Sequence, residues 1–162
     1  MEATMTKKDT LLLIGCIVLC ELVGVFGSFF TAPNIPGWYA ALAKPGFTPP
    51  DWVFAPVWTT LYLLMGVSLF LVIRGGLTGK EVKDAAGAFI AQLALNFLWT
   101  PVFFGLHALW PGFAVIATLL LFIAVTMVLF RRVSPPAAYL LVPYFLWVGY
   151  ASALNLAIAL LN

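Results

Sequence analysis

Five long apolar segments constrain this chain more than any other feature, and they lie at about residues 11–32, 50–73, 85–104, 111–130 and 137–161. A helix needs about 20 apolar residues to cross the hydrocarbon core of a bilayer. Charged residues make up only 9% of the chain, against about 25% in a soluble domain, so they cannot cover a water-exposed surface. We predict an all-α fold, in which residues 1–162 form a single bundle of five transmembrane helices. The lipid bilayer is its first expected partner.

The first apolar segment follows Lys7 and Lys8, as the core of a signal peptide would. It is longer than the 7–15 residues of such a core and lacks a convincing cleavage site, so we expect a retained helix. Cys16 and Cys20 lie one helical turn apart within it. With no other soft ligand nearby, they predict neither a disulfide framework nor a metal site.

The distribution of lysine and arginine predicts the orientation in the membrane. If the N-terminus is cytoplasmic, seven of the eight basic residues lie on that side, and only Lys44 lies across the membrane. The first loop and the C-terminus then lie outside. The lack of a long extension favours a prokaryotic plasma membrane over an outer mitochondrial membrane. Because the net charge is only +2 and the basic residues are scattered, nucleic acid is not an expected partner.

The first loop, residues 33–50, is the only connection long enough to have a role of its own. It reads PNIPGWYAALAKPGFTPP, with prolines that preset the backbone and aromatic residues that can close over a cavity. The odd number of apolar segments argues against the inverted repeats common in secondary transporters.

Glu21 is the only acidic residue deep within a predicted span, and burying an ionisable group there is costly unless it faces the bundle interior or a partner. Two interpretations stay open, a functional group and a protonated or hydrogen-bonded contact between helices. Cys20, Gly24 and Ser28 recur every four residues beside it, which would let another helix approach closely. We favour internal packing over a dimer interface for this stripe.

Polar and aromatic residues share one face on three of the segments. They are Trp58, Tyr62 and Met65 in the second, Gln92, Asn96, Trp99, Thr100 and Phe103 in the third, and Tyr144, Trp147 and Ala151 in the fifth. The Asn96 amide must face inward, because lipid would leave it unsatisfied. Converging Trp and Tyr rings suit a flat apolar ligand held by stacking, although plain core packing is the alternative. For Trp38, Trp52 and Trp110, near span ends, an interfacial position is sufficient explanation.

The sequence lacks the residues of conventional enzyme sites. His107 is the only histidine, so neither a Ser-His-Asp triad nor a His-rich metal site can be assembled. Neither a Gly-rich phosphate loop nor a haem-attachment motif is present. We therefore assign no catalytic residue and no metal ligand. Axial ligation of a non-covalent tetrapyrrole by His107 is a weaker alternative to an interfacial histidine.

Several blocks of this sequence resemble the TspO/MBR family, the translocator or tryptophan-rich sensory proteins. They are WYAALAKPGFTPP and WVFAPVWTTLYLLMG around the first loop, ALNFLWTPVFF in the third segment and LVPYFLWVGYASALN in the fifth. The resemblance covers nearly the whole chain. It implies a five-helix bundle that often dimerises, with a cavity opening toward the first loop that binds porphyrins such as protoporphyrin IX, benzodiazepine-type and isoquinoline ligands and, in some members, cholesterol.

Matching motif positions imply roles for particular residues. Trp38 would belong to a lid formed by the first loop, and Trp58, Asn96 and Trp147 would line the cavity. Adjacent candidates are Tyr62 from the face analysis and Trp99, Phe103, Tyr144, Ala151 and Asn155 from the motifs. Cholesterol-binding members carry a Tyr and a basic residue near the end of the fifth span, and ASALNLAIALLN has neither, which argues against sterol binding.

These observations predict a membrane receptor or sensor that binds porphyrins and similar flat apolar ligands, with the porphyrin as ligand and no cofactor required. Light-dependent degradation of porphyrin, proposed for the family, is one alternative. A porphyrin or small-molecule transporter is another, in which Glu21 would couple transport to protons because buried carboxylates can titrate near neutrality.

Overall fold

The computed structural model describes residues 5–162, and within that range the chain forms helices and no strands. The elements in chain order are α1 (Lys7–Thr31), η1 (Ile35–Tyr39), η2 (Asp51–Val53), α2 (Phe54–Ile73), α3 (Lys80–Thr100), η3 (Pro101–Gly105), α4 (Leu109–Val133), α5 (Pro135–Leu140) and α6 (Val142–Leu161). They provide five apolar spans long enough to cross a membrane. The predicted all-α, five-span fold is confirmed.

The observed helices begin and end at residues that sequence periodicity alone does not identify. α1 begins at Lys7 rather than near residue 11, because Thr6 and Asp9 form a reciprocal capping box that satisfies the first backbone N–H groups. α3 begins at Lys80 rather than near residue 85, and an ion pair between Lys80 and Asp84 (2.8 Å) spans its first turn.

The fifth span, predicted as one segment over 137–161, consists of two helices. α5 ends at Leu140 and α6 begins at Val142. Pro143 accounts for the break, since it has no N–H to donate and its ring would clash with the carbonyl one turn earlier in a continuous helix.

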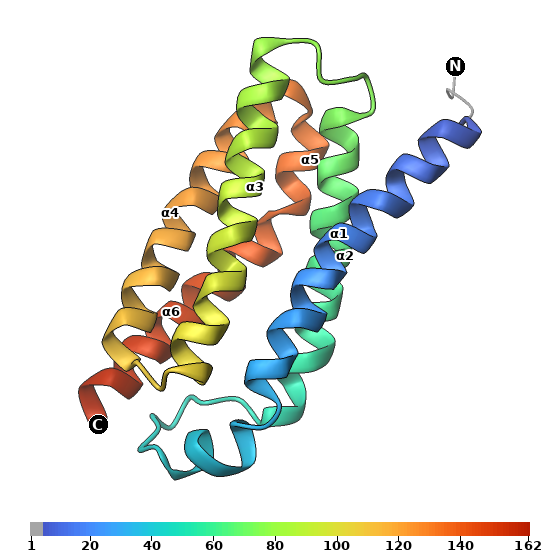
Figure 1. Cartoon of the computed structure of the whole chain (residues 1–162). Helices are drawn as coiled ribbons and strands as arrows, with labels where there is room; N and C mark the ends of the chain where they lie inside the picture. The colour runs from blue at the N-terminus through green and yellow to red at the C-terminus, as the bar shows by residue number, and fades with distance from the viewer. Residues whose placement is uncertain (1–4) are drawn as a thin grey trace.

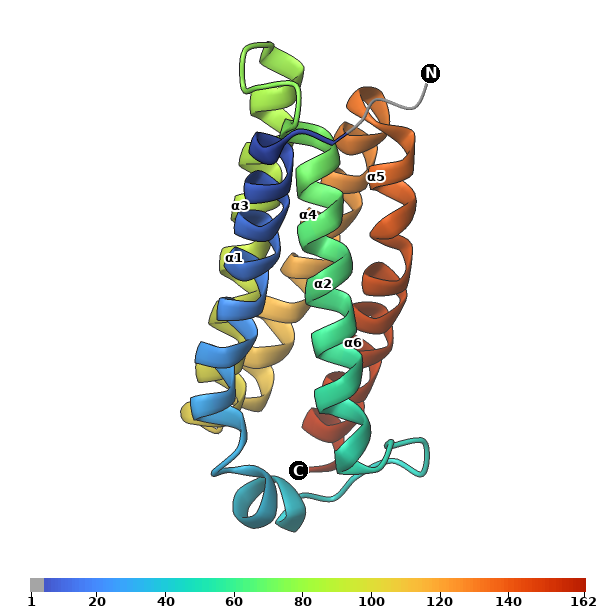
Figure 2. The ribbon, with the colours of Figure 1, turned by 90° about the vertical axis from the view of Figure 1, so that its right-hand side faces the viewer.

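The five spans are arranged in a ring in which α1 contacts α2, α2 contacts α5, the fifth span contacts α4, α4 contacts α3, and α3 returns to α1. The start of α1, the α2–α3 connection and the α4–α5 connection lie at one end of the bundle, and the long first loop and the C-terminus lie at the other (Figures 1 and 2). The predicted cytoplasmic basic residues all belong to the first end.

Small residues hold α1 close against α2. A Cβ atom on Gly66 would lie 2.5 Å from the Cα of Ile17, and one on Gly24 would lie 2.6 Å from the ring of Tyr62. Cys20 is fully buried at the same contact region. Of the stripe Cys20, Gly24 and Ser28, the first two therefore pack internally, as expected, whereas Ser28 is exposed and lines a cavity. Close approach through small residues is how membrane helices commonly associate.

Candidate ligand-binding cavity

A cavity of about 380 Å³ lies between α1, α2, α3 and α6, beneath the long loop. This volume lies within the range of small-molecule sites, roughly 300–1,000 Å³. α5 packs against α2 in one half of the bundle, whereas α6 makes few contacts with α2 in the half nearer the loop. The cavity occupies that loop-proximal half.

A buried hydrogen-bond network forms the inner end of the cavity. The Tyr62 hydroxyl donates to Asn96 Oδ1 (2.6 Å), and Asn96 Nδ2 donates to the Tyr144 hydroxyl (2.9 Å). The Tyr144 hydroxyl in turn donates to Gln92 Oε1 (2.8 Å). Because the network links α2, α3 and α6, it fixes the Asn96 amide and the Tyr62 ring at the cavity wall. The inward position expected for Asn96 is borne out.

Aromatic rings form two walls of the cavity. Trp58 stacks with Tyr62 on α2 (ring centroids 5.6 Å apart), and Trp99 stacks with Phe103 at the end of α3 (5.3 Å). The Trp99 indole Nε1 donates to Asn155 Oδ1 (3.1 Å) on α6, which fixes the plane of the indole. The walls therefore present flat, oriented apolar faces.

The long loop covers the outer end of the cavity through η1. Ile35 and Tyr39 line the cavity. The Lys44 ammonium donates to the carbonyl oxygens of Tyr39 (2.6 Å), Ala40 (3.1 Å) and Leu42 (3.1 Å), which ties the end of η1 together. Burial, together with nearby Asp51, raises the pKa of Tyr39 to about 12, so its hydroxyl stays neutral at physiological pH.

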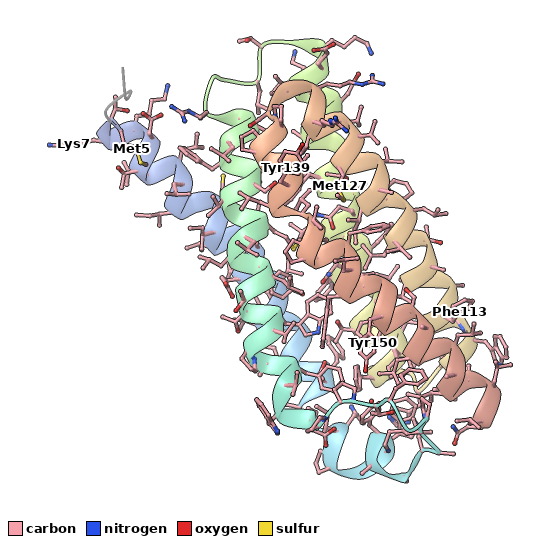
Figure 3. The ribbon with its side chains drawn as sticks, turned by 180° about the vertical axis from the view of Figure 1, so that it is seen from behind. Met5, Lys7, Phe113, Met127, Tyr139 and Tyr150 are labelled. Carbon is pink, nitrogen blue, oxygen red and sulfur yellow. The ribbon has the colours of Figure 1, made fainter. Side chains whose placement is uncertain are left out.

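The far end of the loop is attached to α6. The Asn162 side chain both accepts from the N–H of Ala43 and donates to its carbonyl (3.0 Å each). The Tyr150 hydroxyl donates to the carbonyl of Phe47, and Figure 3 shows Tyr150 on α6 on the side of the bundle that carries this loop. These contacts position the loop over the cavity.

A model of the TspO/MBR family matches residues 16–161 of this chain. This chain belongs to the TspO/MBR family. It is 45% identical to the tryptophan-rich protein TspO of Chlorobaculum tepidum over 156 residues, which cover 96% of this chain and 99% of the relative. It is 40% identical to the translocator protein of Bos taurus (88% and 85% covered) and 41% identical to the tryptophan-rich sensory protein of Cereibacter sphaeroides (77% of each).

Most of the residues that the family motifs and face analysis selected do line the cavity. They are Trp58, Tyr62, Asn96, Trp99, Phe103, Ala151 and Asn155, and Glu21 lines it as well. Tyr144 does not, because it lies behind Asn96 and is fully buried. Trp38 is part of η1 but not of the lining. Its ring stacks on His107 (4.3 Å), whose Nε2 lies 2.9 Å from Asn34 Oδ1.

The expectation that Trp147 lines the cavity of this TspO/MBR-family chain is wrong. Its ring packs against Phe54 (6.1 Å) and Tyr150 (5.6 Å), and its indole N–H is buried without a hydrogen-bond partner among the described residues. Phe54 lines the cavity instead. Helical periodicity places Trp147 on the same side of α6 as Ala151, but it does not reveal that the Trp147 ring packs against Phe54 of α2.

Sequence reasoning also missed several lining residues. They include Gly27, Thr31, Ile35, Asp51, Phe54, Phe104, Leu154 and Ile158. A signal existed for some of them: Phe54 lies one turn before Trp58, and Ile158 lies two turns after Ala151. The loop residues carried no such periodic signal.

Proposed function

We propose that this chain is a membrane receptor that binds porphyrins of the protoporphyrin IX type, and similar flat apolar ligands, between the two aromatic walls and beneath the first loop. The observation that carries the proposal is the pair of oriented indoles, Trp58 and Trp99, on walls that belong to different helices. Flat aromatic ligands gain from stacking on such faces beyond the area they bury. The earlier expectation paired Trp58 with Trp147, and Trp99 now takes that second position.

The open side of the cavity supports a ligand as large as a porphyrin. Val25 and Ser28 on α1 and Ala55 and Thr59 on α2 line the cavity and are also exposed on the outside of the bundle. A macrocycle can therefore place one edge against the walls while the opposite edge extends between α1 and α2. The described lining contains no basic side chain that could pair with the propionates, so they would stay at the outer end of the cavity, where they can reach water.

We further propose that the chain lies in a prokaryotic plasma membrane with the N-terminus and the basic end of the bundle in the cytoplasm. The positive-inside rule supports this orientation. The cavity and its loop would then face the outer side. The dimerisation that the family resemblance implies stays a prediction.

A dark titration with protoporphyrin IX tests the binding proposal. Purified protein in a non-ionic detergent is titrated while the Soret absorbance is followed, for wild type, Trp58→Leu and Trp110→Phe. Trp110 is exposed and does not line the cavity, so it serves as the matched control. We expect saturation near one porphyrin per chain in wild type and Trp110→Phe, and at least about tenfold weaker binding in Trp58→Leu, the loss of about 1.4 kcal/mol of contact. Linear, identical curves in all three would show partition into detergent and refute the proposal.

Light-dependent degradation of the porphyrin is a second candidate, because both indoles that line the cavity would adjoin a bound photosensitiser. Repeating the titration under illumination separates the two. Receptor function predicts that bound porphyrin bleaches no faster than porphyrin in empty micelles. Faster bleaching that disappears in Trp58→Leu and Trp99→Phe would support degradation.

A further inference from the structure

The charged side chains that line the cavity are both acidic. They are Glu21 on α1 and Asp51 at the start of η2, and no lysine, arginine or histidine is among the described lining residues. The basic residue nearest in sequence, Lys44, directs its ammonium to three loop carbonyls instead. When ionised, the two lining carboxylates would favour cationic ligands within walls that are otherwise largely apolar.

Glu21 lines the cavity together with Tyr62 and Asn96. Within residues 5–162, its carboxylate takes part in no hydrogen bond and no ion pair. Three other lining residues use their hydroxyl hydrogens in bonds to other groups. Tyr62 donates to Asn96, while Ser28 donates to Val25 and Thr59 donates to Ala55, each a backbone carbonyl of its own helix.

An unpaired carboxylate within a membrane span is costly and is stabilised by a counter-charge. No basic side chain is among the described lining residues, so a cationic ligand would supply that counter-charge. The same ligand would meet the faces of Trp58 and Trp99, and indole faces attract organic cations through the ring quadrupole. A carboxylate and indole faces in one apolar cavity are the combination that recognises ammonium groups on flat molecules.

We propose that this cavity selects flat organic cations, such as protonated aromatic amines or quaternary aromatic ammonium ions, with the positive charge paired to Glu21. This inference rests on the proposed function only in taking the cavity to be a ligand site. It adds a charge preference that the porphyrin, with its acidic propionates, does not have. Glu21 is then the residue that determines specificity, and Trp58 and Trp99 supply the stacking faces.

A matched series of acridines tests the preference. Binding of N-methylacridinium, neutral acridine and acridine-9-carboxylate is measured by equilibrium dialysis against protein in non-ionic detergent, with protein-free micelles subtracted. The variants are Glu21→Gln and, as a control, Glu81→Gln, an exposed acid in the first turn of α3 outside the cavity. In wild type and Glu81→Gln we expect the order cation, neutral, anion, with the cation favoured over neutral acridine by up to about fivefold, since one ion pair of this kind contributes up to about 1 kcal/mol.

In Glu21→Gln, the cation should lose that advantage while acridine affinity changes less than about twofold, a change within the additivity error of independent sites. Retained acridine binding also shows that the variant is folded. If Glu21→Gln does not fold, the order within wild type still decides: equal binding of cation and anion overturns the proposal. A preference for the cation that is undiminished in Glu21→Gln overturns it as well.

The protoporphyrin titration on the same preparations separates the two proposals. Saturable porphyrin binding without a cation preference refutes this inference and leaves the receptor function standing. A cation preference that depends on Glu21, without porphyrin binding, refutes the porphyrin assignment and leaves this inference standing.

Discussion

The hydrogen bond between Tyr62 and Asn96 gives a direct measure of how firmly the inner end of the cavity is held. Tyr62→Phe removes the donor, and Asn96→Leu removes the acceptor together with the second bond, from Nδ2 to Tyr144. Both side chains are at least nine-tenths buried, so water does not replace the lost partner. Hydrogen bonds between membrane helices average about 0.6 kcal/mol and reach about 1.7 kcal/mol.

We expect Tyr62→Phe to cost about 1 kcal/mol and Asn96→Leu about 1–3 kcal/mol, because the latter leaves two buried hydroxyls with fewer partners. The double variant should show a coupling energy of about 0.6–1.7 kcal/mol. Reversible unfolding by a denaturing detergent in mixed micelles, followed by circular dichroism, measures all four proteins. The 2.6 Å separation and the burial place the coupling in the upper half of that range.

The matched control is a second cycle on Tyr150→Phe with Asn96→Leu, since Tyr150 bonds to the loop and shares no partner with Asn96. That pair should be additive within about 0.3–0.5 kcal/mol. A Tyr62–Asn96 coupling no larger than the control's would refute the reasoning. The network would then be a set of independent contacts that does not fix the cavity wall.

Four further outcomes follow from the site. Trp99→Phe should weaken porphyrin binding several-fold, because it removes the indole that donates to α6. Trp147→Phe should leave porphyrin affinity within about twofold, and it should leave stability unchanged or higher because it removes a buried, unpartnered N–H. Parallel Soret titrations compare the affinities of the two variants, and the detergent unfolding described above measures stability. Lys44→Met should speed porphyrin dissociation several-fold in stopped flow by freeing the end of η1, and Lys83→Met should not. The raised pKa of Tyr39 adds stability that is complete below pH 10, its ordinary pKa of 10.0, and is lost as pH rises through about 12; subtracting the pH–stability curve of Tyr39→Phe should isolate that loss, and a flat difference would contradict it.

The fold was predictable because one physical requirement dominates the sequence. Backbone groups in lipid must bond within their own helix, so each apolar stretch of sufficient length identifies a span with little ambiguity. Ends that depend on local capping, such as Thr6 with Asp9, were misplaced by several residues, because a capping box in a polar flank adds nothing to hydrophobicity.

The candidate site was predictable where helical periodicity carries it and not elsewhere. Asn96 and Tyr62 were identified from their faces, since a buried amide and hydroxyl have to meet partners inside the bundle. Trp147 was misassigned because side-chain packing against Phe54, on another helix, decides whether a ring reaches the cavity. Ile35 lies in the long loop and Asp51 directly after it, at the start of η2, so no helical period relates their sequence positions to the direction of their side chains.

The break between α5 and α6 explains why the bundle has a cavity in one half and not in the other. α5 packs against α2, and Ser68 of α2 donates to the carbonyl of Ala137 (2.7 Å), which closes that half of the ring. After Leu141 the chain continues as α6, which makes few contacts with α2. Close-packed interiors leave little room for a ligand, so a cavity requires that α2 and α6 be separated. Because this separation is confined to the half nearer the loop, the half that contains α5 can remain close-packed and rigid. The loop then has to cover only one end of the cavity.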